Sequence, residues 1–191
     1  MNYLAHLYLA EDSPESILGN LLGDFLKGWR ADNYCEPIRK GIQLHRKVDL
    51  YTDLHLIVRD SKRLISPVNQ RYAGIIVDVF YDHFLAKDWS DYSPISLQSF
   101  TSKVYDILQK NEAILPDSLR NYLPNIIHRN LLMSYAEISG IKFALQRISA
   151  RLKRENQLES ASEDLLTNYE CFELNFRQFF PELISYVKTL R

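Results

Sequence analysis

An all-α fold is predicted for this chain of 191 residues by its low glycine content, its residue preferences and the spacing of its apolar side chains. Only six glycines occur, and five of them lie between Gly19 and Gly74. The remainder is rich in Leu, Glu, Lys, Arg and Gln, which favour helix. Apolar residues recur at intervals of three and four, whereas no alternation of period two persists. The length fits a single domain over residues 1–191.

In the first half of the chain, capping residues and prolines mark where helices begin. Asn2 can cap a first helix, and Pro14 suits the first turn of a second, where its missing N–H costs little. Pro67 is expected to end a helix and Gly28 another. In order, we expect helices over residues 2–10, over residues 12–28, from Pro37 onward, over residues 54–65 and over residues 69–87.

The second half is punctuated by Pro94, Pro116, Pro124 and Gly140. Between these breaks the apolar spacing predicts further helices and no sheet. We expect them over residues 96–110, 116–136, 141–155 and 162–180, with a short helix after Pro181.

Composition and charge exclude several classes of protein. With 23 basic and 24 acidic groups the chain has a formal net charge of −1, so no global field indicates a nucleic-acid partner. It contains neither a phosphate-binding lysine loop nor a dinucleotide fingerprint. Cys35 and Cys171 are too few for a disulfide framework, which favours reduced cytosolic thiols. No signal peptide and no apolar run of roughly 20 residues is evident, so we expect a soluble, cytoplasmic protein.

Three short stretches place polar side chains four residues apart, at residues 19–25, 45–49 and 78–83. On an α-helix that spacing stacks both side chains on one face. Helices that turn such groups inward can build a metal site in the core of a bundle. The three pairs are Asn20 with Asp24, His45 with Asp49, and Asp78 with Asp82.

The first stretch places a carboxylate on an apolar helix face. Asp24 must there be paired, hydrogen-bonded or metal-bound, because burying a lone carboxylate is costly. The alternative is a bond to a nearby arginine or to helix-terminal amides. His6, in the apolar run near the N-terminus, can equally be a satisfied core histidine. Gly19, Gly23 and Gly28 each weaken a helix, so we expect a neighbouring backbone or a ligand to approach them closely.

The second stretch is the densest polar cluster of the sequence. Neutral imidazole is a preferred ligand of transition metals, and Asp49, one turn after His45, can orient that ring or bind directly. Arg46 offers a planar fork for a phosphate. The alternative is a surface ladder of ion pairs. Lys62-Arg63 and the basic run at residues 151–154 are interpreted as solvated helix faces, with docking of an acidic partner as the alternative.

The third stretch lies in an otherwise nearly apolar helix, so Asp78, Asp82 and His83 are expected to be partly buried together. Carboxylates this close repel each other unless a proton or a cation intervenes. A divalent cation solves that problem, and the sequence therefore predicts hydrolytic metal chemistry.

Four segments in the same order resemble a known family. They are Met1-Asn-Tyr-Leu-Ala-His-Leu-Tyr-Leu-Ala10, Gly19-Asn-Leu-Leu-Gly-Asp-Phe25, Gly41-Ile-Gln-Leu-His-Arg-Lys-Val-Asp-Leu-Tyr-Thr-Asp53 and Asp78-Val-Phe-Tyr-Asp-His-Phe-Leu-Ala-Lys-Asp-Trp89. They resemble segments of the acyl carrier protein phosphodiesterases, also called holo-acyl-carrier-protein hydrolases. That family is similar to the HD phosphohydrolases, an all-α superfamily that binds divalent metal through His and Asp.

The resemblance implies an enzyme that hydrolyses the phosphodiester between 4′-phosphopantetheine and a serine of holo-acyl carrier protein, an acidic protein substrate. Mn²⁺ is the implied metal, with Mg²⁺ or Fe²⁺ as alternatives. The products would be apo-carrier protein and 4′-phosphopantetheine. Two other hypotheses remain open: a metal phosphohydrolase of nucleotides or small phosphodiesters, and a helical protein that binds carrier protein without turnover.

Our hypothesis for the site joins the three stretches and His6 around one or two cations. The superfamily doublet is His followed by Asp, whereas here it reads Asp82-His83, which leaves open which of the two ligates. Arg46 would neutralise charge on the phosphate, and Lys27, Arg30, Arg39, Lys40 and Arg63 could steer an acidic partner. The expected metal ligands are His6, Asp24, His45, Asp82 and His83. The expected catalytic residues are Asp24, His45, Arg46, Asp49 and Asp78, with Asn20 and Asp53 as supporting groups.

Overall fold

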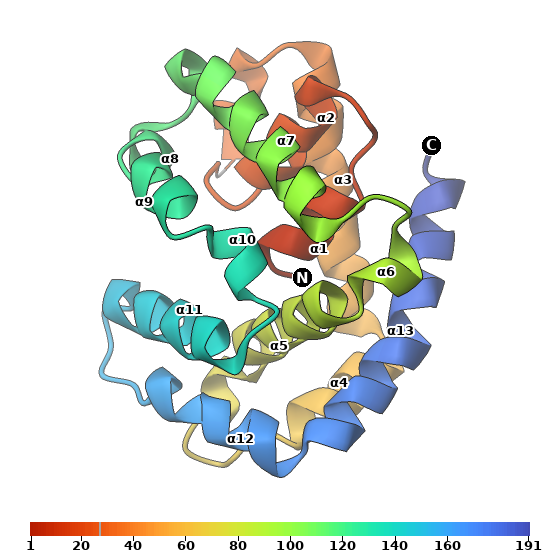
Figure 1. The fold of residues 1–191 in the computed structure, drawn as a ribbon, viewed down its shortest axis with the longest axis vertical. Coiled ribbons are helices and arrows are strands. Elements are labelled where there is room, and N and C mark those ends of the chain that lie inside the picture. The colour runs from red at the N-terminus through yellow and green to blue at the C-terminus, as the bar shows by residue number, and fades with distance from the viewer. Residues whose placement is uncertain (27) are drawn as a thin grey trace.

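The computed structural model describes residues 1–26 and 28–191, and within them it contains helices and no strand, which confirms the all-α prediction (Figure 1). The α-helices are α1 (Tyr3–Tyr8), α2 (Pro14–Leu22), α3 (Glu36–Leu54), α4 (Leu56–Arg63), α5 (Ala73–Lys87), α6 (Trp89–Tyr92), α7 (Leu97–Lys110), α8 (Asp117–Arg120), α9 (Leu123–His128), α10 (Leu131–Ser134), α11 (Ile138–Arg151), α12 (Ala161–Thr167) and α13 (Tyr169–Thr189). Short 3-10 turns cover Gly28–Asn33, Gln70–Tyr72, Glu112–Ile114 and Leu158–Ser160.

Helices α2 and α3 pack with their backbones in close approach. A Cβ added at Gly19 would lie 2.3 Å from the carbonyl oxygen of Ile38 and 2.7 Å from the Cα of Gly41. Only a residue without a side chain fits at such a crossing. The predicted close approach of a neighbouring backbone is therefore confirmed at Gly19, and it fixes the position of α3 against α2.

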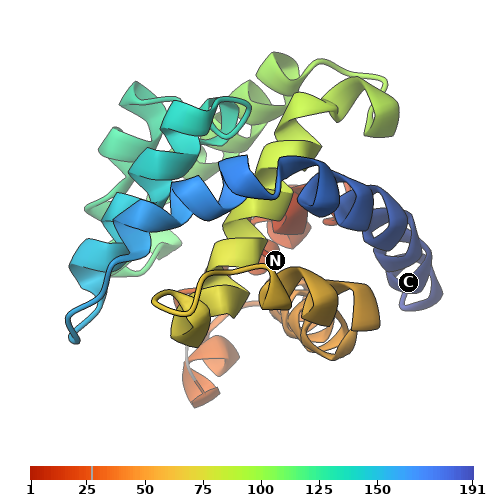
Figure 2. The ribbon, with the colours of Figure 1, turned by 90° about the horizontal axis from the view of Figure 1, so that it is seen from below.

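Helix α5 is the buried centre of the fold, as its apolar sequence predicts. It contacts α1, α4, α11 and α13, and Figure 2 shows it passing between the N-terminal and C-terminal helices. Its aromatic side chains pack on those of α13, with Phe80 edge-on to Phe172 and Tyr81 edge-on to Phe176. This packing holds the polar residues of α5 at a fixed depth beneath α1.

Several predicted helix bounds are wrong. The helix expected over residues 141–155 spans Ile138–Arg151, and the one expected over residues 162–180 is interrupted at Asn168, between α12 and α13. The helix expected over residues 12–28 ends at Leu22, because Gly23 is its C-cap and the backbone then turns. The helix expected to stop before Pro181 continues to Thr189 with the proline inside it. A proline inside a helix removes one hydrogen bond, and here buried side chains on both sides, Phe180 and Leu183, keep the helix packed.

The helix predicted over residues 116–136 is broken into α8, α9 and α10. Pro124 lies within the first turn of α9, where it starts a helix instead of continuing one. Asn130 adopts φ 45°, the left-handed conformation, and separates α9 from α10. These breaks turn the chain around Tyr105, whose hydroxyl accepts a hydrogen bond from the backbone N–H of Leu132 at 3.0 Å.

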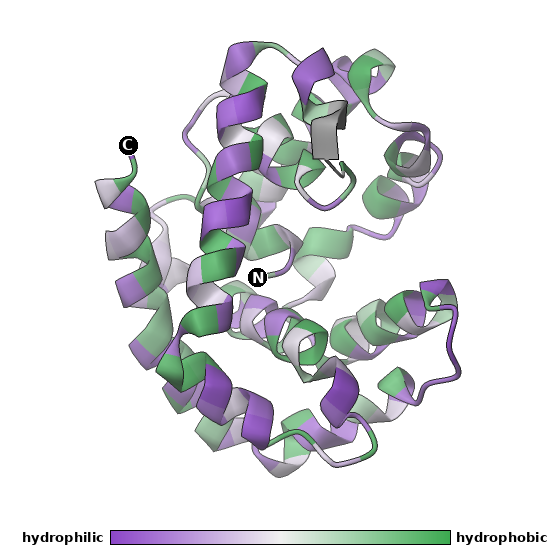
Figure 3. Cartoon of the chain, turned by 180° about the vertical axis from the view of Figure 1, so that it is seen from behind, coloured by the Kyte–Doolittle hydropathy of each residue, from purple (hydrophilic) through white to green (hydrophobic). Residues whose placement is uncertain are grey.

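Most surface helices alternate between hydrophobic and hydrophilic segments, the pattern of helices buried on one side (Figure 3). No described helix combines the length and the apolar character that crossing a membrane requires. Cys35 and Cys171 are both free and exposed.

Candidate metal centre

A cluster of two imidazoles and a carboxylate lies where α1 meets α3. His6, His45 and Asp49, named here the His–Asp cluster, each offer one ligand atom, and these atoms all lie within 4.8 Å of one another. The Nε2 atoms of His6 and His45 lie 3.0 and 3.1 Å from the two carboxylate oxygens of Asp49. Asp49 therefore bridges two rings that belong to different helices.

The local sequence explains how the two rings come together. His45 and Asp49 are one turn apart on α3, so the predicted spacing places both on the same face. Gly23 leaves room for the His45 ring, because a Cβ there would lie 2.2 Å from its Cγ. The rings of His6 and His45 stack with centroids 3.7 Å apart. The close approach predicted at Gly23 is thus confirmed, and its partner is the candidate ligand itself.

The hydrogen bonds of His45 fix which ring nitrogen can bind a cation. Its Nδ1 lies 2.8 Å from the backbone carbonyl of Asn20, an acceptor only, so Nδ1 must carry the proton. Its Nε2 then faces Asp49 at 3.1 Å and Asp24 at 3.8 Å, and it is the ring nitrogen that could bind a cation after giving up its proton. In metal-binding histidines, a hydrogen bond from the ring nitrogen that does not bind the metal orients the ring in this way. Asn20 contacts the cluster through its backbone only, because its side-chain amide donates to the Ser16 carbonyl instead.

His6 is completely buried and is held neutral. Burial lowers its pKa to about 3, and the adjacent His45 ring and Met1 ammonium act in the same direction. Its Nε2 lies 3.0 Å from the Met1 carbonyl, whereas its Nδ1 has no hydrogen-bond partner in the described part of the chain. A satisfied core histidine would have both nitrogens paired, so this observation favours the ligand interpretation of His6.

The carboxylates of Asp24 and Asp49 differ in environment. Asp24 is at the mouth of the site with a side chain 37% exposed, and burial of its surroundings raises its pKa to about 6. Burial also acts to raise the pKa of Asp49. Hydrogen bonds from His45 and His6 together with the Met1 ammonium outweigh it and hold the pKa of Asp49 well below its ordinary value. Asp49 is therefore a permanent anion, and Asp24 titrates near neutral pH.

A cationic group already lies between two of the carboxylates. The ammonium of Met1 lies 3.2 Å from Asp49 Oδ1 and 3.2 Å from Asp78 Oδ1. Burial opposes its charge, yet the attraction of Asp78 and Asp49 raises its pKa to about 10. Burial in turn raises the pKa of Asp78. The sequence predicts a cation for Asp78 with Asp82, whereas this ammonium joins Asp78 with Asp49. The carboxylate oxygens and imidazole nitrogens of the cluster are ligand types that a divalent metal accepts.

Asp82 and His83 do not belong to this group. Asp82 accepts hydrogen bonds from the backbone N–H groups of Leu4 and Ala5 at 2.8 and 2.9 Å, so its carboxylate caps the first turn of α1. Burial raises the pKa of Asp82 to about 7, against those two hydrogen bonds. The predicted cap residue, Asn2, makes no capping hydrogen bond with its side chain. Sequence reasoning missed this cap because it joins residues 78 positions apart.

His83 points to the opposite side of α5. Its Nδ1 lies 2.8 Å from the Tyr135 carbonyl, and its Nε2 lies 2.8 Å from the Tyr169 hydroxyl. Both nitrogens are therefore paired, as in a core histidine. Two further predicted residues also lie outside the cluster: Arg46, expected to be catalytic, is exposed, and Asp53, expected to be a supporting group, pairs with Lys62 at 2.8 Å.

Replacing Asp82 with alanine is expected to destabilise the protein by about 3 kcal/mol, because it leaves two buried N–H groups without an acceptor. For a protein of this size that corresponds to a fall in Tm on the order of 10 °C. Thermal unfolding followed by circular dichroism measures it. Asp106→Ala, at an exposed position of α7, is the matched control and should leave Tm unchanged. A Tm for Asp82→Ala within 2 °C of the control, a margin below the roughly 2–4 °C per kcal/mol expected for this size, would contradict the capping role.

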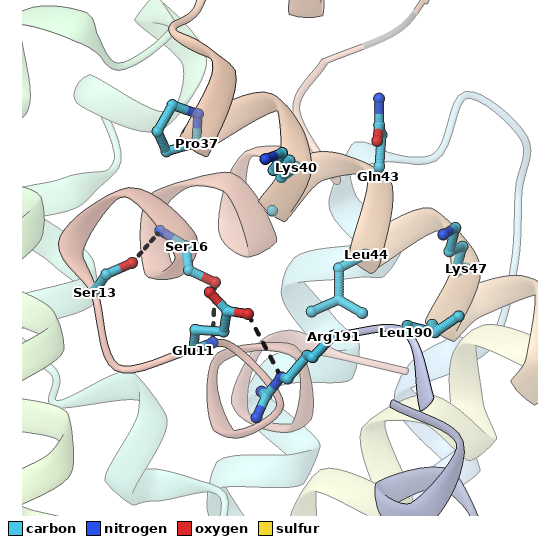
Figure 4. Close-up of a pocket in the computed structure, with 11 residues that line it drawn as sticks. Glu11, Ser13, Ser16, Pro37, Lys40, Gln43, Leu44, Lys47, Leu190 and Arg191 are labelled. Carbon is cyan, nitrogen blue, oxygen red and sulfur yellow. Dashed lines mark hydrogen bonds and ion pairs between the residues drawn. The ribbon is translucent and has the colours of Figure 1, made fainter. Parts of the chain in front are cut away.

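Cavities lie on both sides of the cluster. One, of about 550 Å³, lies between α3, the α1–α2 connection and the C-terminal residue Arg191, and none of its lining side chains belongs to the cluster (Figure 4). Of its lining cations, Lys40 pairs with Glu36 and Arg191 with Glu11, whereas Lys47 forms no ion pair among the described residues. The other, of about 670 Å³, includes Asp24 in its wall. Of the predicted steering residues, Lys27 lies outside the described residues, and the side chain of Arg30 is not described.

Comparison with known proteins gives a consistent result. The family model described as acyl carrier protein phosphodiesterase matches residues 1–183. Proteins named acyl carrier protein phosphodiesterase are similar over nearly their whole length: one of Serratia proteamaculans is 36% identical over 98% of both chains, and one of Pectobacterium atrosepticum is 34% identical over 99% of this chain and 98% of that one. One of Escherichia coli is 35% identical over 97% of this chain and 96% of that one. No solved structure matches.

Proposed function

This chain belongs to the acyl carrier protein phosphodiesterase family, and from that premise we propose that it hydrolyses the phosphodiester between 4′-phosphopantetheine and a serine of holo-acyl carrier protein. The products are apo-carrier protein and 4′-phosphopantetheine. The observation that supports metal-assisted hydrolysis is the His–Asp cluster, in which His45 Nε2 faces Asp49 while the Asn20 carbonyl holds the Nδ1 proton.

The residues that would hold a divalent metal are His45, Asp49 and His6, with Asp24 at the open side. When bound, Mn²⁺, or alternatively Mg²⁺ or Fe²⁺, lowers the pKa of a water molecule and polarises a phosphoryl oxygen. His6 is neutral through burial, which is the form that binds metal. The structure supports this ligand set better than one with Asp82 and His83, since the polar atoms of both are paired elsewhere.

Within this site, Asp24 is suited to move a proton. Its carboxylate is 37% exposed and lies 3.8 Å from His45 Nε2, so it can reach both the cluster and a solvent molecule at the mouth of the site. We propose that Asp24 accepts a proton from the attacking water and returns it to the departing serine oxygen. The Met1 ammonium forms ion pairs with both Asp49 and Asp78, and these ion pairs hold the Asp49 carboxylate in place. The contact between Arg46 and the phosphate stays a prediction.

The experiment is to incubate the purified protein with holo-acyl carrier protein and to follow loss of the prosthetic-group mass. We expect release in the presence of Mn²⁺, none after treatment with a chelator, and recovery when Mn²⁺ is returned. Elemental analysis of the purified protein identifies the metal. Release that persists without metal would refute metal assistance.

The same experiment separates the other hypotheses. Turnover of nucleotides or small phosphodiesters in competition, without loss of the prosthetic group, would indicate a different phosphohydrolase. Binding of carrier protein that is insensitive to chelator, without product, would indicate a binding protein and refute the proposed activity.

A further inference from the structure

The cavity of about 670 Å³ beside Asp24 is formed by segments far apart in the sequence. Asp24 forms part of the cavity wall and lies 3.8 Å from His45 Nε2, so the cavity adjoins the His–Asp cluster through Asp24. Its volume lies in the range of about 300–1,000 Å³ that is typical of sites for small molecules. The lining residues are Tyr3, Asp24, Phe25, Ser118, Tyr122, Arg147, Ala150 and Arg151.

Two arginines of α11 face this cavity. The guanidinium of Arg147 stacks over the ring of Tyr122 at 4.2 Å, which fixes its plane and leaves its N–H edge for an anion. Arg151 lies close to the Tyr3 hydroxyl. Burial and the charge of Asp24 raise the pKa of Tyr3, whereas Arg151 acts to lower it. Among residues 1–26 and 28–191, no carboxylate forms an ion pair with either guanidinium. Uncompensated cations next to an acidic centre indicate a site for an anionic ligand.

We propose that this cavity binds the phosphopantetheine group of the substrate, with Arg147 and Arg151 holding the phosphate and the aromatic side chains covering the pantetheine arm. The inference rests on the proposed function. The phosphorus that reacts must lie beside Asp24 and the cluster, which places its anionic oxygens toward the arginines. The remaining arm is uncharged and partly apolar, and Tyr3, Phe25 and Tyr122 provide a surface for it.

The position of the cavity also distinguishes it from a docking surface for the carrier protein. Arg151 is exposed at its rim, whereas Arg147 is partly buried against Tyr122 and Phe143. A ligand that contacts Arg147 must therefore reach past the exposed rim of the cavity. The basic run at residues 151–154, interpreted from the sequence as a solvated face, has its first residue in the wall of this cavity.

The test is calorimetric binding of 4′-phosphopantetheine, which the enzyme does not cleave further, with pantetheine as the ligand that lacks the phosphate. We expect Arg147→Ala to weaken binding of 4′-phosphopantetheine by about tenfold or more, as loss of a charged hydrogen bond does, and to leave the weaker binding of pantetheine little changed. Arg147→Lys should lie in between, because it retains charge without the planar stack. With holo-carrier protein, KM should rise more than kcat falls.

Arg129→Ala is the matched control, since Arg129 also stacks on Phe143, at 4.7 Å, but lines a different cavity. It should bind as the wild type does. Equal binding by Arg147→Ala and Arg129→Ala would overturn this assignment, and so would no binding of 4′-phosphopantetheine by the wild type. If neither Arg147→Ala nor Arg129→Ala changed the hydrolysis of holo-carrier protein, the assignment of this cavity would be overturned while the proposed function would stand. Binding that depends on Arg147 without hydrolysis would overturn the proposed activity alone.

Discussion

Replacing Asp49 with asparagine is expected to lower kcat/KM by on the order of a thousandfold or more, the range seen when one member of a catalytic unit is removed. The Asp49 carboxylate lies 3.0 Å from His6 Nε2, 3.1 Å from His45 Nε2 and 3.2 Å from the Met1 ammonium. Asparagine preserves the shape but removes the charge that joins these groups. Its amide N–H₂ cannot accept hydrogen bonds and would face one of the donors.

Asp53→Asn is the control for this effect, because Asp53 lies one turn further along the same helix. Its side chain is 66% exposed and pairs with Lys62, a surface interaction worth about 0–1 kcal/mol. We expect wild-type turnover of holo-carrier protein from Asp53→Asn. Elemental analysis should show bound metal lost from Asp49→Asn and retained in the control. Retention of metal together with activity within tenfold of the wild type would show that Asp49 is not part of the centre.

The sequence predicted the neighbourhood of the site, because helical spacing depends only on the chain itself. His45 and Asp49 share a face of α3 as expected, and both belong to the His–Asp cluster. The same spacing also put Asp78 and Asp82 on one face of α5, but the structure uses them differently. Asp78 pairs with the Met1 ammonium, and Asp82 caps α1. Spacing shows which side chains share a face, and it does not show what that face meets.

Contacts between distant segments account for the other differences. The satisfied ring of His83 depends on Tyr135 and Tyr169, which lie 52 and 86 positions away. The cavity beside Asp24 depends on α11, which no motif marks. Gly19 and Gly23 were the signals that anticipated tertiary contacts, because a glycine in a helical segment costs stability unless a neighbouring group occupies the space of its side chain.

Gly23→Ala is expected to reduce activity nearly as much as removal of the His45 ring itself, on the order of a thousandfold. The new Cβ would lie 2.2 Å from Cγ, 2.3 Å from Cδ2 and 2.7 Å from Nδ1 of His45. That ring is 2% exposed and is held by the Asn20 carbonyl, so it cannot move away without losing this bond. Gly23 has φ −51° and ψ −38°, which alanine adopts freely, so the effect is a steric clash with the ring and not backbone strain.

Gly74→Ala separates this clash from a general effect of the substitution. A Cβ at Gly74 would meet only the end of the Lys62 side chain, at 3.7 Å, an ordinary contact. Because alanine there reduces the freedom of the unfolded chain, Gly74→Ala should raise stability by about 0.4–1 kcal/mol and leave kcat/KM unchanged. Circular dichroism should show a folded protein for both variants, with bound metal lost only from Gly23→Ala. If Gly23→Ala instead kept full activity and metal, His45 would have to reach the centre from another position, and the ligand set proposed for this fold would be wrong.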